Sequence, residues 1–400
     1  KFIFATNRFH MNPSANGWIK KLLKDVSKNE TFLQLPLNSF YHQIKLSGYI
    51  YGNNVQVINE VFDKKDWTDE ELCKVNHVLT LYYIHQKEKQ ETDFVENIIR
   101  FYKAVDDFKE SFIHGILGKK QSSILLEGII HRRIHIDDNV LTKNFNYFIT
   151  NALLFIDALA YQKFLENHLI SDTYFKTMEL VIETIALTVF ELKTNKTKYD
   201  QSLIKLFESS LRYQFTKNKS YNDVIKYPEN TLEKYYCIDI ACMAAWTDKK
   251  IDAKEQEFLN QLGNDLMMKP EVAQHAMNDI NLFYITNKDH IALLSQKNVV
   301  QSFYDNSSKM VMKLINRNSK RLLTELRESK ELMLLLTKST KRNLTEAEQK
   351  KVHDQLLDII KSIPSLAIFM LPGGAILLPL FVKFIPKLLP SSFDENRIEE

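Results

Sequence analysis

Four acidic residues in the middle of the chain have the chemistry needed to bind a hard metal ion. Asp239 lies inside an apolar segment, residues 235–246, and Asp248, Asp252 and Glu255 follow it closely. Carboxylate oxygens are the ligands that calcium prefers, so the four acids could surround such a cation. Asp252 and Glu255 also have the spacing of a capping box, which satisfies free amides at a helix start. The sequence therefore leaves both a cation site and a helix cap open.

Two histidines offer a second arrangement of possible metal ligands. His131 and His135 are four residues apart, so on a helix they would lie on one face and could share a metal ion. The sequence fixes no third ligand, and the neighbouring Arg132 and Arg133 would repel a cation. This pattern is more typical of a polar helix end than of a metal centre.

Motifs of known catalytic types are absent from the sequence. It contains no glycine-rich phosphate loop, no nucleophile elbow and no catalytic metal motif. The three cysteines, Cys73, Cys237 and Cys242, lack metal-ligand spacing, and their number and placement fit a reducing compartment. We therefore expect a protein that is not an enzyme and that holds no cofactor.

The charge balance bears on the kind of partner. A formal net charge of +3 is small for 400 residues, so electrostatics gives no indication of nucleic-acid binding by direct readout. Protein partners are expected, but the sequence does not identify them.

Composition and periodicity predict an all-α protein. The chain has only nine glycines and nine prolines, fewer than average, so few turns interrupt it. Periodic apolar positions predict an N-terminal helical bundle over residues 11–220 and a long, charged connector helix over 299–337. Met11 resembles a natural start, so residues 1–10 are expected to be upstream or mis-annotated sequence. The helices expected within the bundle cover residues 18–26, 68–84, 93–108, 122–136, 145–169, 174–192 and 203–215.

The C-terminal part holds a long uncharged run. Residues 365–382 carry no charged side chain, which is close to the minimum for a membrane-spanning helix. Pro372, Pro379 and Pro386 recur every seven residues and would share one side of a helix. Gly373 and Gly374 favour a kink or a re-entrant turn. The run predicts a straight span or a membrane hairpin, and the alternative is a buried core hairpin of a soluble protein.

Charged residues on either side of this run bear on orientation and on ion chemistry. The lysine- and arginine-rich segment before it predicts an N-terminal bulk in the cytoplasm and a short tail outside. Asp358 precedes the run and Lys383 follows it. In a hairpin the two would come together and neutralise each other, whereas in a straight span they would be independent.

The segment 344–393 resembles the membrane-anchoring region of the LETM family, the leucine-zipper EF-hand-containing transmembrane proteins of mitochondria and their bacterial relatives. The resemblance covers about an eighth of the chain and is specific, because many prolines lie in register. The matching residues are Leu344, Thr345, Glu348, Asp358, Pro364, Pro372, Leu378, Pro379, Lys383, Pro386, Leu389, Pro390, Ser391 and Phe393.

This resemblance implies several functions. Members of the family are tied to cation/proton exchange, organelle volume control and ribosome contact, and bacterial relatives to biofilms. Eukaryotic members carry a glutamate where this chain has Ala375, which removes the carboxylate best placed to bind a cation in the membrane. We therefore favour a membrane-anchored scaffold of the bacterial inner membrane, with lipid as a partner. Ion exchange is the alternative, and a cytoplasmic protein with a ribosome- or protein-binding role is the second.

A second resemblance covers residues 230–294. An apolar helix is followed by Asp248, Ile251, Asp252 and Glu255, which open another helix, as in the tellurite-resistance TerB-like fold. Lys249 stands where that fold usually has a glycine. The resemblance implies a small helical domain with acidic residues at its helix junction.

Overall fold

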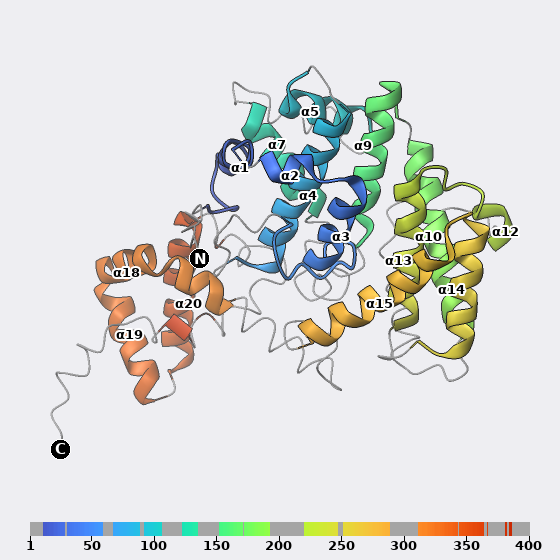
Figure 1. Cartoon of the computed structure of the whole chain (residues 1–400). Coiled ribbons are helices and arrows are strands. Elements are labelled where there is room, and N and C mark those ends of the chain that lie inside the picture. Colours follow the sequence, from blue (N-terminus) through green and yellow to red (C-terminus); the bar gives the residue numbers. More distant parts are fainter. Residues whose placement is uncertain are drawn as a thin grey trace, which may run out of the picture. The chain divides into compact units, whose positions relative to one another are not determined.

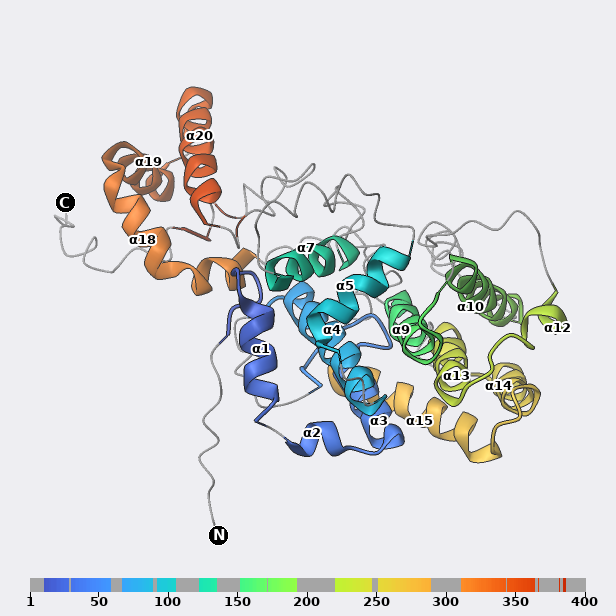
Figure 2. The ribbon, with the colours of Figure 1, turned by 90° about the horizontal axis from the view of Figure 1, so that it is seen from above.

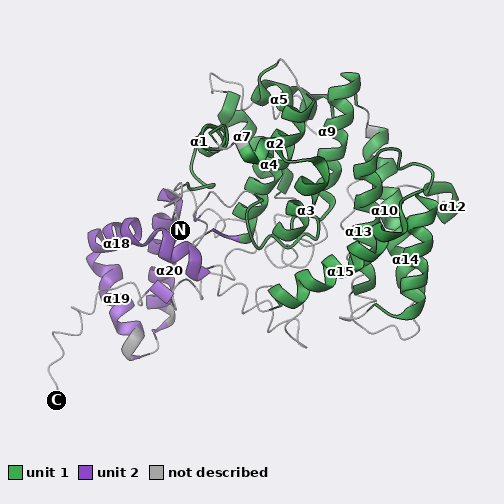
Figure 3. Ribbon diagram, in the orientation of Figure 1, with its two compact units in different colours: residues 1–64, 69–136, 145–291 green, residues 65–68, 137–144, 292–400 purple. Residues whose placement is uncertain are grey.

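A computed structural model of the whole chain gives the arrangement of its helices (Figure 1). All regular secondary structure in the part that it describes is helical, which confirms the all-α prediction. The chain divides into two compact units, coloured separately in Figure 3. The structure describes residues 11–28, 30–58, 67–88, 92–105, 122–134, 152–170, 172–192, 220–246, 251–288, 311–342, 344–363, 366, 381, 384 and 385.

Unit 1 comprises residues 1–64, 69–136 and 145–291. Both the predicted N-terminal bundle and the predicted TerB-like region contribute helices to it, and the boundary between them stays a prediction. Its helices are α1 (Trp18–Val26), α2 (Glu30–Gln34), α3 (Leu37–Ser47), α4 (Asp69–Lys87), α5 (Phe94–Ala104), α7 (Ser122–Ile134), α9 (Phe155–Asn167), α10 (Asp172–Leu192), α12 (Tyr221–Val224), α13 (Thr231–Ala245), α14 (Ala253–Asp265) and α15 (Pro270–Asn287).

Most of the helices expected from periodicity are present in unit 1. The helix predicted over 18–26 is confirmed as α1, and those over 68–84, 93–108, 122–136 and 174–192 correspond to α4, α5, α7 and α10. The helix expected over 145–169 corresponds to α9 in its second half. The helix predicted over 203–215 lies outside the described residues, as do residues 1–10.

Two helices are buried on nearly all sides. α4 buries residues around its whole circumference and packs against α7 and α9 (Figure 2). α13 is similarly enclosed and packs against α10, α14 and α15. A helix that is buried around its circumference lies at the centre of a bundle, whereas an amphipathic helix such as α1 covers the bundle from outside. The core of unit 1 therefore forms around α4 and α13.

Unit 2 comprises residues 65–68, 137–144 and 292–400. Its helices include α18 (Ser319–Glu328), α19 (Lys330–Lys341) and α20 (Glu346–Ser362), which pack against one another. Together they enclose a hydrophobic core that contains Leu322, Leu326, Leu336, Leu356 and Ile360.

The single connector helix expected over 299–337 is wrong in its described part. The chain leaves the helical conformation at Ser329, with φ −100° and ψ 91°, and a new helix starts there. The Ser329 hydroxyl accepts a hydrogen bond from the amide of Leu332 at 3.3 Å, as an N-cap does. Apolar residues on both sides of this break enter the same core, so packing against α20 favours separate short helices over one long one.

Candidate functional site

Asp239, the first of the predicted cation ligands, lies buried in α13. It forms an ion pair with Lys45 of α3, with 3.2 Å between the ammonium nitrogen and Oδ1. The hydroxyls of Tyr41 and Tyr51 donate to its oxygens at 2.8 and 3.4 Å. The Lys45 ammonium thus stands where a bound cation would have to lie.

A second carboxylate completes this cluster. Asp279 of α15 lies 2.5 Å from the Lys45 ammonium, so one lysine is shared by two aspartates from different helices. Burial of Lys45 disfavours its charged form, but attraction by Asp239 and then Asp279 outweighs this and raises its pKa. We call Lys45, Asp239 and Asp279 the lysine triad. It joins α3 to α13 and α15.

The other predicted ligands form a helix cap. The Asp252 side chain accepts from the Glu255 amide, and the Glu255 side chain accepts from the Asp252 amide, both at 2.9 Å. The capping box expected at the start of α14 is therefore confirmed. Asp248 lies outside the described residues. In the described ranges, no three acidic, histidine or cysteine side chains are grouped so that they could hold a metal ion.

A buried polar network that the sequence did not predict lies around Asp157 of α9. Arg133 donates to its two carboxylate oxygens at 2.6 and 2.7 Å, and the hydroxyl of Tyr102 donates at 3.0 Å. The ring of His77 bonds to the hydroxyls of Tyr49 and Tyr102 at 2.5 and 2.8 Å. All five side chains are buried, so the network holds helices together inside the core.

Only one of the two histidines predicted as possible metal ligands is described. His131 is exposed and lies 3.7 Å from Glu70 of α4, while His135 lies outside the described residues. The proposed repulsion by Arg133 does not arise, because that guanidinium points into the core toward Asp157. The sequence around Arg133 gives no indication of this partner, because Asp157 lies 24 residues away on another helix.

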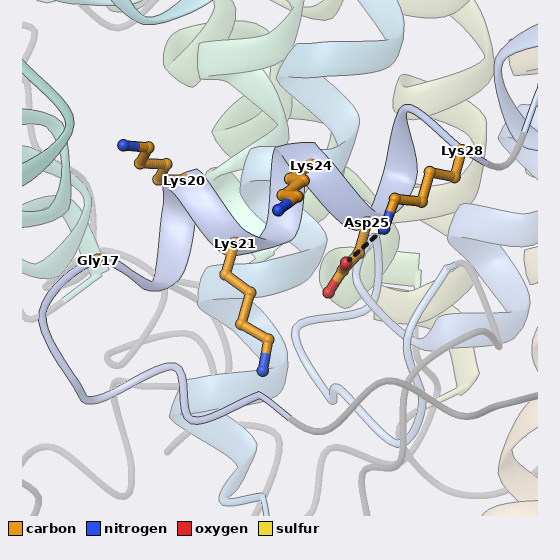
Figure 4. A pocket seen from close by; sticks show the side chains of 6 residues that line it. All are labelled: Gly17, Lys20, Lys21, Lys24, Asp25 and Lys28. Atoms are coloured by element: carbon orange, nitrogen blue, oxygen red, sulfur yellow. Dashed lines mark ion pairs between the residues drawn. The ribbon is translucent and has the colours of Figure 1, made fainter.

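The surface of α1 carries an open hollow of about 390 Å³. Figure 4 shows the side chains that line it: Gly17, Lys20, Lys21, Lys24, Asp25 and Lys28. The four lysines are exposed, whereas Asp25 is buried and lies 3.8 Å from Lys28. Four ammonium groups against one mostly covered carboxylate make this hollow positively charged.

In unit 2, α20 begins with a capping box that the sequence analysis did not predict, and an arginine reinforces it. Thr345 and Glu348 cap each other, and Arg342 donates to both oxygens of Glu348 at 2.8 and 2.7 Å. These hydrogen bonds, first from Arg342 and then from the Thr345 backbone, lower the pKa of Glu348 to about 2. The start of this helix is thus fixed at neutral pH.

The possible ion-related residues and the proline pattern are only partly described. Asp358 is exposed on α20 and pairs with Lys361 at 2.8 Å. Its predicted contact with Lys383 stays untested, because Lys383 lies outside the described residues. So do the predicted membrane-segment residues Pro364, Pro372, Gly373, Gly374, Pro379, Pro386 and Pro390.

Four residues in and after the uncharged run are described, and all are buried. Leu366, Phe381, Phe384 and Ile385 belong to the same hydrophobic core as α18, α19 and α20. Within the part of the chain that the structure describes, no helix has the length and apolarity needed to span a bilayer.

Comparison with known proteins identifies the C-terminal segment. A family model described as LETM1-like, RBD matches residues 344–400. Residues 344–400 are LETM1-like. The match supports the resemblance to the LETM family that the proline register predicted, and it is limited to this C-terminal segment. No curated protein and no solved structure matches the chain.

Proposed function

We propose that this LETM-related protein is a membrane-anchored helical scaffold. The observation that carries the proposal is the uncharged run 365–382 inside the matched segment 344–400. Such a run is long enough to cross or enter a bilayer. Basic residues before it favour an inner-membrane protein of bacteria with its bulk in the cytoplasm. Unit 1 supplies the helical surfaces that bind protein partners, in support of the envelope or of biofilm-associated growth.

Ion exchange has weaker support. Moving a cation through lipid requires a polar partner within the membrane. Ala375 occupies the position of the family's glutamate, and Asp358 is exposed and paired with Lys361. Neither residue offers a carboxylate held ready for a cation, so the scaffold is the better supported function.

A second candidate function rests on the burial of Leu366, Phe381, Phe384 and Ile385. These side chains pack in a protein core with α18–α20, as in a soluble helical protein. In that case the LETM-like segment completes unit 2, and the protein binds partner proteins or the ribosome without entering lipid.

Carbonate extraction of a membrane fraction separates the two candidates. The full chain is compared with Leu377→Lys, which places a charge in the uncharged run. Leu334→Lys is the control, because Leu334 is 65% exposed on α19. The scaffold predicts that wild type and Leu334→Lys stay in the carbonate-washed membrane while Leu377→Lys is released. Release of all three chains would support the second candidate.

A further inference from the structure

Helix α1 divides its side chains sharply between two sides. Trp18, Ile19, Leu22 and Val26 are buried in unit 1. Lys20, Lys21 and Lys24 are exposed on α1, and Lys28 follows two residues after the helix ends and lies beside Asp25 (Figure 4). Because the apolar side is already covered by protein, α1 presents its lysines without being free to insert into lipid.

A distant side chain fixes this helix in place. Gly17, the N-cap of α1, provides no side-chain cap, and Glu127 of α7 accepts from the amides of Gly17 and Ile19 at 3.0 and 3.1 Å. Glu127 therefore occupies the amides that would otherwise attract an anion at the helix start. Any affinity of this surface for anions must come from the lysines.

The chemistry of the hollow selects among anionic partners. Its lining, within the described part of the chain, includes neither an aromatic ring nor an arginine. Binding of single-stranded nucleic acid usually relies on aromatic stacking, and readout of guanine on bidentate arginine. Lysines are compact point charges that attract the phosphates of an anionic membrane surface, each contributing about 1 kcal/mol.

We propose that the lysine face, formed by Lys20, Lys21 and Lys24 of α1 and by Lys28 just after it, binds the phosphate headgroups of anionic lipids. This inference rests on the proposed function, because it assigns unit 1 a second, electrostatic contact with the membrane. The uncharged C-terminal run would anchor the chain irrespective of lipid charge, while the lysine face holds unit 1 against an anionic surface.

The experiment measures binding of the full chain to two kinds of vesicle, one of phosphatidylcholine alone and one of phosphatidylcholine mixed with phosphatidylglycerol. The test variant replaces all four lysines of the face by glutamine. The control replaces four exposed lysines elsewhere in unit 1, Lys103, Lys226, Lys254 and Lys288, by glutamine, which changes the net charge equally. Circular dichroism confirms that each variant keeps its helix content.

We expect wild type and control to prefer the anionic vesicles, and the test variant to lose about several hundredfold of that preference, since each of the four lysines contributes about fivefold. The preference should fall with added salt, because the Debye length shrinks from about 10 Å at 0.1 M to about 3 Å at 1 M.

Equal losses in test variant and control would overturn the proposal, since net charge alone would then explain the preference. Stronger binding to a single-stranded RNA probe than to anionic vesicles, abolished in the test variant, would assign the face to nucleic acid and also overturn it. Binding to neutral vesicles tests the C-terminal anchor separately. Its absence would contradict the proposed membrane anchor, and the preference for anionic vesicles would still test the lysine face.

Discussion

At the scale of single residues, the protein stabilises buried charge with its own side chains. Asp239 lies beside Lys45, and Asp157 beside Arg133, each with tyrosine hydroxyls as further donors. A buried ion needs such partners because removal from water is costly. Among the predicted metal ligands, Asp239 is thus paired with a protein cation, whereas Asp252 and Glu255 accept from backbone amides.

The lysine triad gives a prediction on coupling. Lys45→Met leaves two aspartates without their shared cation, and breaking a buried pair typically costs about 3–5 kcal/mol. Adding Asp239→Asn removes one of the uncompensated charges, so the double variant should recover part of this loss. Denaturant unfolding of wild type, both single variants and the double variant measures the coupling. Strictly additive effects would show that the pair contributes nothing specific.

Gly48 gives a second prediction at this scale. It ends α3 with φ +79°, and an added Cβ would overlap the carbonyl oxygen of Asn53 and the ring of Phe283. Gly48→Ala should therefore destabilise the protein by more than about 2 kcal/mol, from the left-handed backbone and the overlap together. Gly17→Ala is the control, because Gly17 has φ +87° but open space around it. Similar shifts in the denaturation midpoint for both would contradict the steric argument.

At the scale of helices, the ends are fixed by both local and distant side chains. α14 carries the capping box expected from its sequence and α20 carries another, while α1 depends on Glu127, which lies 110 residues from Gly17. A local cap can be recognised from spacing, but a distant one cannot.

The cap of α14 gives a prediction that separates structure from metal binding. Asp252→Ala should cost about 1 kcal/mol, within the usual 0.5 to 2 range, because the N-cap acceptor is lost. Asp252→Asn retains an acceptor and is the matched control. Calcium or magnesium should leave the thermal midpoint of every form unchanged. A rise with metal that disappears in Asp248→Asn would instead support a cation site.

The end of α14 contains a residue that can be improved. Met267 has φ +55° and is 83% exposed, so a methionine adopts a left-handed conformation without packing in return. Met267→Gly should raise the free energy of unfolding by about 1 kcal/mol, because glycine suits this position after a helix. Met268→Gly is the control. Because Met268 has no positive φ, glycine there relieves no strain, and this variant should be less stable than wild type. No gain at Met267 would mean that its conformation is unstrained.

At the scale of the whole molecule, unit 1 buries many ionisable groups that are neutral or paired when folded. Burial raises the pKa of Tyr41, Tyr49 and Tyr51, and raises that of Tyr83 to about 12. The stability that these groups contribute is fully present below the unfolded tyrosine pKa of about 10 and is lost as pH rises through the higher folded values. The raised pKa of Lys45 acts in the same direction.

Unit 1 should therefore unfold cooperatively in alkali, above about pH 10. Phenolate absorbance and helical circular dichroism are measured together as pH rises. We expect most phenolate to appear with the loss of helix rather than before it. Complete tyrosine ionisation near pH 10 with intact helices would contradict the burial of these rings.

The sequence by itself determined the features that depend on neighbours along the chain. Periodic apolar positions predicted α1, α4, α5, α7 and α10, spacing predicted the capping box of α14, and the proline register predicted the resemblance of the C-terminal segment to the LETM family. Helix formation and capping involve residues three or four apart, so a linear pattern records them.

Only the tertiary structure decided what the charged residues do. The partner of Asp239 is Lys45 of another helix, Glu127 caps a helix that starts 110 residues earlier, and Arg133 turns inward to Asp157. Packing likewise divided the expected connector at Ser329, because apolar residues on both sides of it enter one core. These outcomes depend on which helix faces pack against each other in the folded protein. Local spacing in the sequence does not specify that packing.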